Sequence, residues 1–132
     1  MIDRTVFLIG MPGSGKSSLG KRLAGRLQMR YVDTDQRICD AAGCSVTDIF
    51  ARYGEQAFRN AETNVLTQIA YEPPAIVSTG GGMVMREVNQ RIMRNHGVIV
   101  LIDRPLEDIM SDIKLDRRPL LAQKGLGEGE GL

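Results

Sequence analysis

The chain has 132 residues, of which 42% are hydrophobic and 25% are charged, and its formal net charge is +1. This composition is that of a water-soluble domain large enough to bury one core. A net charge so close to zero gives no electrostatic reason to expect nucleic acid or an anionic membrane as a partner, and no apolar run reaches the ~20 residues of a membrane span. With no cluster of histidines and carboxylates to complete a metal site, Cys39 and Cys44 are expected to be free thiols, as in a cytoplasmic protein.

Short apolar runs that predict β-strands alternate along the chain with segments of helical periodicity. Strands are expected at residues 6–9, 31–32, 75–77 and 98–102. Helices are expected at 16–28, at 35–42, for a turn or two after a capping box that begins at Ser45, at 55–70, at 86–95 with Gly97 as C-terminal cap, and from Pro105 onward. The first and last strands are continuous apolar runs, which suits burial on both faces of a parallel sheet. The alternation predicts a single doubly wound α/β domain over residues 1–132.

Residues 10–17 read G-x-x-x-x-G-K-S, the pattern of a P-loop, and stand between the first expected strand and the first expected helix. The backbone N–H groups of such a loop surround phosphate oxygens, and the N-terminus of the following helix adds partial positive charge. Lys16 is expected to reach the β- and γ-phosphates, and the Ser17 hydroxyl is expected to ligate Mg²⁺. The residues expected to contact ATP in this segment are Gly13, Ser14, Gly15, Lys16, Ser17 and Ser18.

A pair of carboxylates, Asp33 and Asp35, follows the second expected strand. Ligands of open parallel sheets bind at the carboxyl ends of the strands, so the two groups could serve a metal ion and a reacting hydroxyl separately. The alternative is a local structural role, because Thr34 or Asp35 could cap the next helix.

Arg59 and Glu62 are three residues apart on an expected helix and can therefore form an ion pair. Such a pair at the surface contributes little to stability. The functional interpretation is that Glu62 orients Arg59 for two-point recognition of a substrate carboxylate.

Three consecutive glycines, Gly80, Gly81 and Gly82, come directly after the third strand and Thr79. Three glycines in a row cost backbone entropy, and their use is to let the backbone approach a ligand closely. The alternative is a tight turn, for which one or two glycines would be enough.

The order and spacing of five motifs closely resemble those of the shikimate kinases. These motifs are the P-loop, D-T-D, G-E-x-x-F-R-x-x-E, T-G-G-G and the R-R-P-L-L of residues 117–121. The resemblance runs from Thr5 to about Ala122. It implies a P-loop kinase fold with a parallel sheet of order 2-3-1-4-5 and helices on both faces. It also implies transfer of the γ-phosphate of ATP to the 3-hydroxyl of shikimate, a step of aromatic amino-acid biosynthesis.

The resemblance carries roles over to matching positions on the nucleotide side. Lys16 would be catalytic as well as phosphate-binding, and Asp33 would join Ser17 at Mg²⁺ through water. Arg118 matches the arginine of the family's lid, which closes over ATP, and residues 113–126 would form that lid. Ser78 stands where many P-loop enzymes place an aspartate that supports the metal.

On the substrate side, the resemblance makes Asp35 the catalytic base at the attacking oxygen and a partner of the shikimate hydroxyls. Arg59 would bind the shikimate carboxylate. Backbone groups of the segment Gly80, Gly81 and Gly82 would complete the substrate contacts.

The family continues past the lid with a helix, a last strand and a last helix, for which residues 125–132, a glycine-rich end expected to be flexible, offer no match. Two other functions therefore remain open: nucleotide binding with deficient catalysis, and a related activity such as gluconate kinase. In each case the expected partners are small molecules, and the expected state is a monomer.

Overall fold

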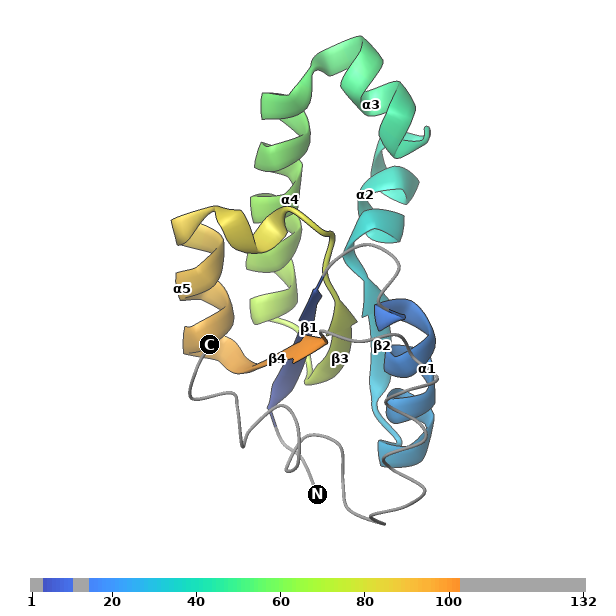
Figure 1. Cartoon of the computed structure of the whole chain (residues 1–132), viewed down its shortest axis with the longest axis vertical. Helices are drawn as coiled ribbons and strands as arrows, with labels where there is room; N and C mark the ends of the chain where they lie inside the picture. The colour runs from blue at the N-terminus through green and yellow to red at the C-terminus, as the bar shows by residue number, and fades with distance from the viewer. Residues whose placement is uncertain (1–3, 11–14, 103–132) are drawn as a thin grey trace.

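Strands and helices alternate through residues 4–10 and 15–102, the part of the chain that the computed structural model describes (Figure 1). The elements follow in the order β1 (Thr5–Gly10), α1 (Lys16–Leu27), β2 (Arg30–Asp33), α2 (Thr34–Ala42), α3 (Val46–Tyr53), α4 (Glu55–Ala70), β3 (Ala75–Ser78), the 3₁₀ turn η1 (Met83–Met85), α5 (Glu87–His96) and β4 (Gly97–Ile102). The expected strands and helices up to residue 102 are present, and η1 is an addition.

The four described strands form a parallel sheet of order β2-β3-β1-β4. At the centre, Phe7 of β1 lies between Val77 of β3 and Ile99 of β4. This confirms the expected fold class and the expected neighbours of these four strands. A fifth strand, the helix from Pro105, the lid at 113–126 and the glycine-rich end at 125–132 lie outside the described residues.

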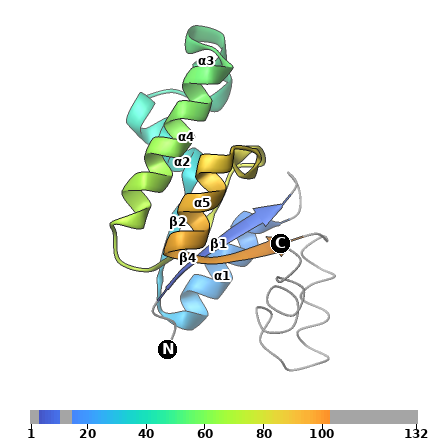
Figure 2. The same ribbon diagram turned by 90° about the vertical axis from the view of Figure 1, so that its left-hand side faces the viewer.

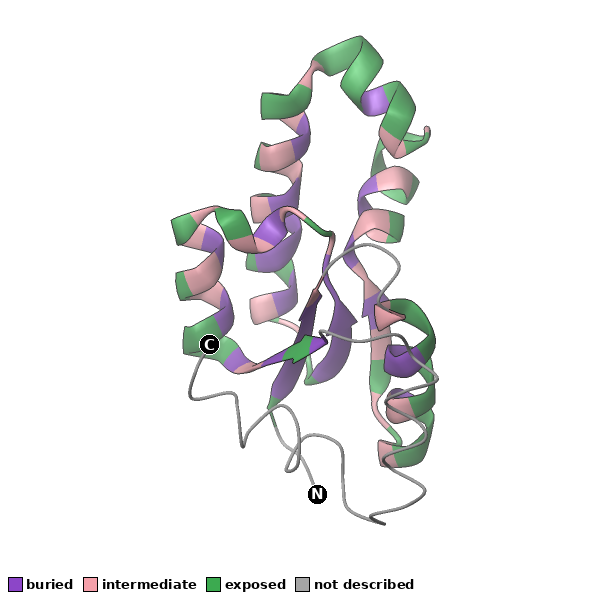
Figure 3. Cartoon of the chain, in the orientation of Figure 1, coloured by how far each residue is buried: buried purple, intermediate pink, exposed green. Residues whose placement is uncertain are grey.

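Both faces of the sheet are covered, because successive side chains of a strand point to opposite sides. On β1, Val6 and Leu8 join the core beneath α1, whereas Phe7 and Ile9 join the core beneath α4 and α5. Figure 3 shows β1 and β3 as continuously buried, and Figure 2 shows α5 lying along α4. The continuous apolar run of β1 therefore reflects burial on both faces, as expected, whereas β4 is only partly buried and exposes Leu101.

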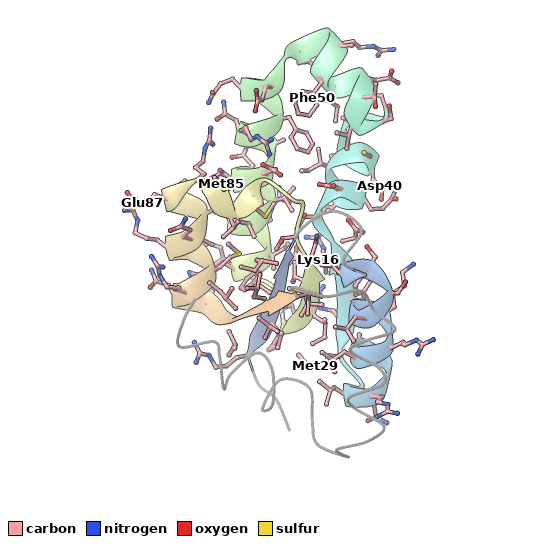
Figure 4. The ribbon with its side chains drawn as sticks, in the orientation of Figure 1. Lys16, Met29, Asp40, Phe50, Met85 and Glu87 are labelled. Atoms are coloured by element: carbon pink, nitrogen blue, oxygen red, sulfur yellow. The ribbon has the colours of Figure 1, made fainter. Side chains whose placement is uncertain are left out.

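Helices α2, α3 and α4 extend beyond the carboxyl ends of the strands, with α3 farthest from the sheet (Figure 1). Phe50 of α3 stacks on Phe58 of α4 with 5.0 Å between ring centroids, at the position labelled in Figure 4. This contact packs α3 against the first turn of α4.

Two local expectations change in the structure. The N-cap of α2 is Asp33, whose Oδ1 accepts from the N–H of Gln36 at 3.1 Å, so neither Thr34 nor Asp35 has that role. Gly97 is the C-cap of α5, as expected, but its backbone is extended with φ of −174°, it begins β4, and a Cβ there would clash with the carbonyl oxygen of Thr5. Glycine is required at this position by close approach of two strands.

Within the described residues, no helix is long and apolar enough to cross a membrane.

Candidate active site

The carboxyl ends of β1, β2 and β3 meet at one cavity of about 350 Å³. Asp33 at the end of β2 pairs in register with Ser78 at the end of β3, and the P-loop leaves β1 beside them. The cavity is lined by residues 15–18, by Asp33 and Asp35, and by residues 78–81. Three segments widely separated in the sequence are thus brought to one place. Gly82 is beside this lining, and Gly13, Ser14 and Arg118 lie outside the described residues.

Lys16 is the first residue of α1, and its ammonium donates a hydrogen bond to the carbonyl oxygen of Gly10 at 2.7 Å. The preceding Gly15 is in the left-handed region with φ of 91°, which favours glycine there. Burial lowers the pKa of Lys16, and the nearby Asp35 and Asp33 oppose that shift. Figure 4 shows Lys16 near the centre of the molecule, where α1 begins.

Ser17 and Asp33 meet across the cavity floor: the serine hydroxyl donates to Asp33 Oδ2 at 3.2 Å. Asp33 therefore caps α2 with one oxygen and faces the P-loop with the other. A hydroxyl and a carboxylate are hard oxygen ligands of the kind that Mg²⁺ prefers, and Mg²⁺ usually takes only one or two protein ligands beside phosphates and water. Among the described residues, no group of three or more His, Cys, Asp or Glu could hold a metal by itself. The residues present thus fit Mg²⁺ that arrives with a phosphate.

Asp35 is half-buried in the first turn of α2, and its Oδ1 has no hydrogen-bond partner among the described residues. Burial raises the pKa of this carboxyl, the neighbouring Asp33 raises it further, and Lys16 and Arg59 oppose the rise. A carboxylate with raised proton affinity and a free acceptor atom at a cavity is suited to bind a hydroxyl and take its proton.

The Arg59–Glu62 pair exists and is not a surface pair. Arg59 Nη1 lies 2.9 Å from Glu62 Oε1, and only 1% of the Glu62 side chain is exposed. Glu55 contacts the same guanidinium at 3.5 Å, and the hydrogen bond that Arg59 donates to Glu62 raises the pKa of Arg59. Burial raises the pKa of Glu62, against the opposing effect of Arg59. In place of a weak surface pair, a buried glutamate therefore orients a half-buried guanidinium.

Gly80 and Gly82, after β3, lie close against these same side chains. A Cβ on Gly80 would lie 2.6 Å from Asp35 Oδ1 and 3.1 Å from Glu62 Oε2, the second carboxylate oxygen without a partner among the described residues. A Cβ on Gly82 would lie 2.6 Å from Arg59 Nη1. Close approach, rather than a tight turn alone, explains the run of glycines.

Two residues that support the site were not among the sequence candidates. Thr34, fully buried, accepts a hydrogen bond from the N–H of Gly80 at 3.1 Å, which ties D-T-D to the glycine segment. Thr79 donates from its hydroxyl to the carbonyl of Leu8 at 2.8 Å. The position of Thr34 between the two aspartates of D-T-D is the sequence feature that could have indicated its role. Ser78 donates to the carbonyl of Lys16 at 3.0 Å and thereby supports the start of α1.

A P-loop that opens the first helix of this parallel sheet, with a cavity leading to two carboxylates and a guanidinium, defines the chain as an α/β P-loop kinase for a small acceptor. The model of the shikimate kinase family matches residues 12–130. The chain belongs to the shikimate kinase family.

Curated relatives and solved structures agree with this assignment. The chain is 39% identical to shikimate kinase of Clostridium botulinum (strain Eklund 17B / Type B) over 116 residues, which cover 88% of this chain and 70% of the relative. It is 44% identical to that of Microcystis aeruginosa over 123 residues, covering 92% and 64% respectively. The structure matches shikimate kinase from Acinetobacter baumannii in complex with shikimate with a TM-score of 0.75 and 31% identity, covering 89% of this chain and 66% of that one. The chain thus spans about two thirds of the length of these relatives.

Proposed function

We propose that this chain transfers the γ-phosphate of ATP to the 3-hydroxyl of shikimate and so forms shikimate 3-phosphate and ADP for aromatic amino-acid biosynthesis. The observation that carries the proposal is that Asp35 lines the cavity that begins at Lys16, with the guanidinium of Arg59, oriented by Glu62, close enough to oppose the rise in the pKa of Asp35. A guanidinium held by a buried glutamate is a receptor for a carboxylate, and Asp35 is an acceptor for a hydroxyl. Shikimate carries both groups, and family membership supports the same substrate.

On the nucleotide side, residues 10–17 and the N-terminus of α1 hold the phosphates through backbone N–H groups, among them those of Gly13, Ser14, Gly15 and Ser18. Lys16 neutralises charge on the transferring group. Ser17 and Asp33 would hold Mg²⁺, directly and through water, and the ion would supply positive charge at the β- and γ-phosphates. Arg118, in the proposed lid at 113–126, is a further cation for the same charge.

On the substrate side, Arg59 binds the carboxylate and the backbone of residues 80–82 borders the ring. Asp35 accepts the proton of the 3-hydroxyl as the hydroxyl oxygen bonds to the γ-phosphorus. The bond between that phosphorus and the bridging oxygen breaks, and ADP keeps the electron pair. This reaction needs positioning and charge neutralisation and no covalent enzyme intermediate.

The proposal extends to the state of the protein: one kinase domain over residues 1–132, monomeric and cytoplasmic. The free thiols of Cys39 and Cys44 support the cytoplasmic location. Sedimentation at micromolar concentration tests the monomer, and a dimer would contradict it.

A coupled ADP-release assay tests the activity with shikimate or gluconate as acceptor, with and without Mg²⁺. We expect ADP release that requires both shikimate and Mg²⁺, and loss of at least about a hundredfold in turnover for Asp35→Asn with ADP affinity kept. Release with gluconate would assign the chain to a different acceptor. ATP binding without any shikimate-dependent release would support the alternative of nucleotide binding without phosphoryl transfer.

A further inference from the structure

A chain of hydrogen bonds runs behind the proposed carboxylate site and involves residues that do not line the cavity. Arg86, which precedes α5, donates from Nη1 to Thr63 Oγ1 on α4 at 3.0 Å. The Thr63 hydroxyl donates in turn to Asn89 Oδ1 at 2.7 Å, and Asn89 Nδ2 donates to the carbonyl oxygen of Met83 at 2.9 Å. Figure 4 labels Met85 and Glu87, which flank Arg86, at the start of α5.

This network leaves little room for an alternative arrangement at its centre. Asn89 is 1% exposed, so its amide has no access to water as a replacement partner. A hydroxyl has one proton to donate, and Thr63 places it at 2.7 Å from Asn89 rather than at 3.3 Å from the carbonyl of Arg59. Loss of the hydroxyl would leave Asn89 Oδ1 without a donor in the interior, which is costly.

Both ends of the network reach the substrate side of the site. Arg86 Nη1 also donates to the carbonyl oxygen of Arg59 at 3.2 Å, in the turn of α4 that carries the guanidinium. At the other end, the N–H of Met83 donates to the carbonyl oxygen of Gly80 at 3.2 Å. Four side-chain hydrogen bonds and η1 therefore connect the backbone of Arg59 to the glycine segment. The guanidinium of Arg59 lies against that same segment.

We propose that Thr63, Asn89 and Arg86 are positioning residues that fix the glycine segment 80–82 relative to Arg59 and so set the affinity for the carboxylate substrate. The inference rests on the proposed function for the identity of that substrate. Because a Cβ on Gly82 would already meet the guanidinium at 2.6 Å, a small shift of this segment relative to α4 changes the space in which a carboxylate is received. In the described residues, the side-chain hydrogen bonds of Thr63, Asn89 and Arg86 end on α4, on η1 or on one another, and none reaches α1 or β1 of the nucleotide side.

The test compares Thr63→Val, which keeps the shape and removes the hydroxyl, with Thr63→Ser, which keeps the hydroxyl. Calorimetry on the full chain measures the dissociation constants of shikimate and of ADP separately. We expect Thr63→Val to weaken shikimate about tenfold with ADP affinity unchanged, and Thr63→Ser to retain wild-type affinity for both. Thr67→Val is the matched control: its hydroxyl, one turn farther along α4, donates to the carbonyl of Thr63 at 2.9 Å on the exposed side and reaches no site element.

Equal weakening of both ligands by Thr63→Val would show a general structural role and overturn the proposal, as would an unchanged shikimate affinity. If Thr63→Val does not fold, Arg86→Lys replaces it, with Arg91→Lys on the exposed face of α5 as control; a lysine keeps the charge but not the guanidinium fork. The same selective loss for shikimate is then expected.

Absence of shikimate binding by the wild-type chain would contradict the proposed function, and hydrogen exchange then decides the network by itself. In Thr63→Val, we expect faster amide exchange in residues 80–85 with exchange in β1 unchanged, and no such change in Thr67→Val. Unchanged exchange in residues 80–85 would overturn the positioning role.

Discussion

The two sides of the cavity are built in different ways. On the nucleotide side the contacts are short in sequence: Lys16 bonds to the carbonyl of Gly10, and Ser17 reaches Asp33 sixteen residues on. On the substrate side, the contributing groups come from three separate segments: Asp35, Arg59 and the glycine segment. This side also holds two buried carboxylate oxygens, on Asp35 and Glu62, that have no hydrogen-bond partner in the described part of the chain. A contiguous loop can hold phosphate by its backbone, whereas a specific acceptor requires side chains from several elements and acceptor atoms left open for the ligand.

Replacing the lysine of the nucleotide side is expected to have the largest effect. Lys16→Ala should lower turnover about 10²–10³-fold, roughly 2.7–4 kcal/mol, because the ammonium stabilises charge in the transition state. Shikimate affinity should not change, since Arg59 and Glu62 are untouched. Steady-state kinetics and calorimetry measure the two quantities, and turnover above about a tenth of the wild-type value would contradict the role.

A substitution at Arg59 tests the substrate side in the same way. Arg59→Lys should weaken shikimate by roughly 1.5–3 kcal/mol with ADP affinity unchanged, because an ammonium cannot form two parallel bonds to a carboxylate while still pairing with Glu62. Arg91→Lys, in an exposed pair with Glu87, is the control. Calorimetry with shikimate alone and with ADP alone measures the two affinities. An equal loss of ADP affinity would show that the two sides of the cavity are not independent.

A glycine substitution tests close approach without removing a charge. Gly82→Ala places a Cβ 2.6 Å from Arg59 Nη1, at the end of a long side chain that can move, so we expect about tenfold weaker shikimate binding and an almost unchanged melting temperature. Gly25→Ala in α1 has no atom within 4 Å of the new Cβ and should raise stability by about 0.5–1 kcal/mol without affecting either ligand. A large loss of stability in Gly82→Ala would mean that the guanidinium cannot yield.

The smallest effect is expected at an ion pair outside the cavity. Glu72 lies 2.8 Å from Arg37 and 3.4 Å from Arg30, and the hydrogen bond from Arg37 lowers its pKa. Because the folded state has the lower pKa, this stabilisation is complete above the ordinary value of 4.5 and is lost as the pH falls through the lower folded value.

In Glu72→Gln, the free energy of unfolding should therefore fall less between pH 6 and about pH 3 than in the wild type, by less than about 1 kcal/mol, with activity at pH 7 retained. Glu87→Gln, whose pair with Arg91 is exposed, should follow the wild-type curve. Coincident curves for Glu72→Gln and wild type would show that the pair contributes nothing measurable.

The elements were more predictable than the contacts between them. The limits expected for α4 agree with the structure, and Ser45 is the N-cap of α3, with its hydroxyl accepting from the N–H of Asp48 at 3.1 Å. Such features depend on neighbours within one or two turns. The N-cap of α2 was missed, because Asp33, Thr34 and Asp35 are all competent caps and the course of β2 decides which one is placed to act.

The sequence by itself determined the P-loop, the alternation of strands and helices, and the set of residues from which a kinase site could be built, because periodicity, capping and glycine content are local properties of the chain. Only the tertiary structure decided that Glu62 is buried, that Gly80 and Gly82 lie against Asp35 and Arg59, and that Thr34, Thr63 and Asn89 support them. These contacts join positions far apart in the sequence, and their geometry follows from how α4, η1 and α5 pack on a twisted sheet. No spacing within the chain encodes that packing.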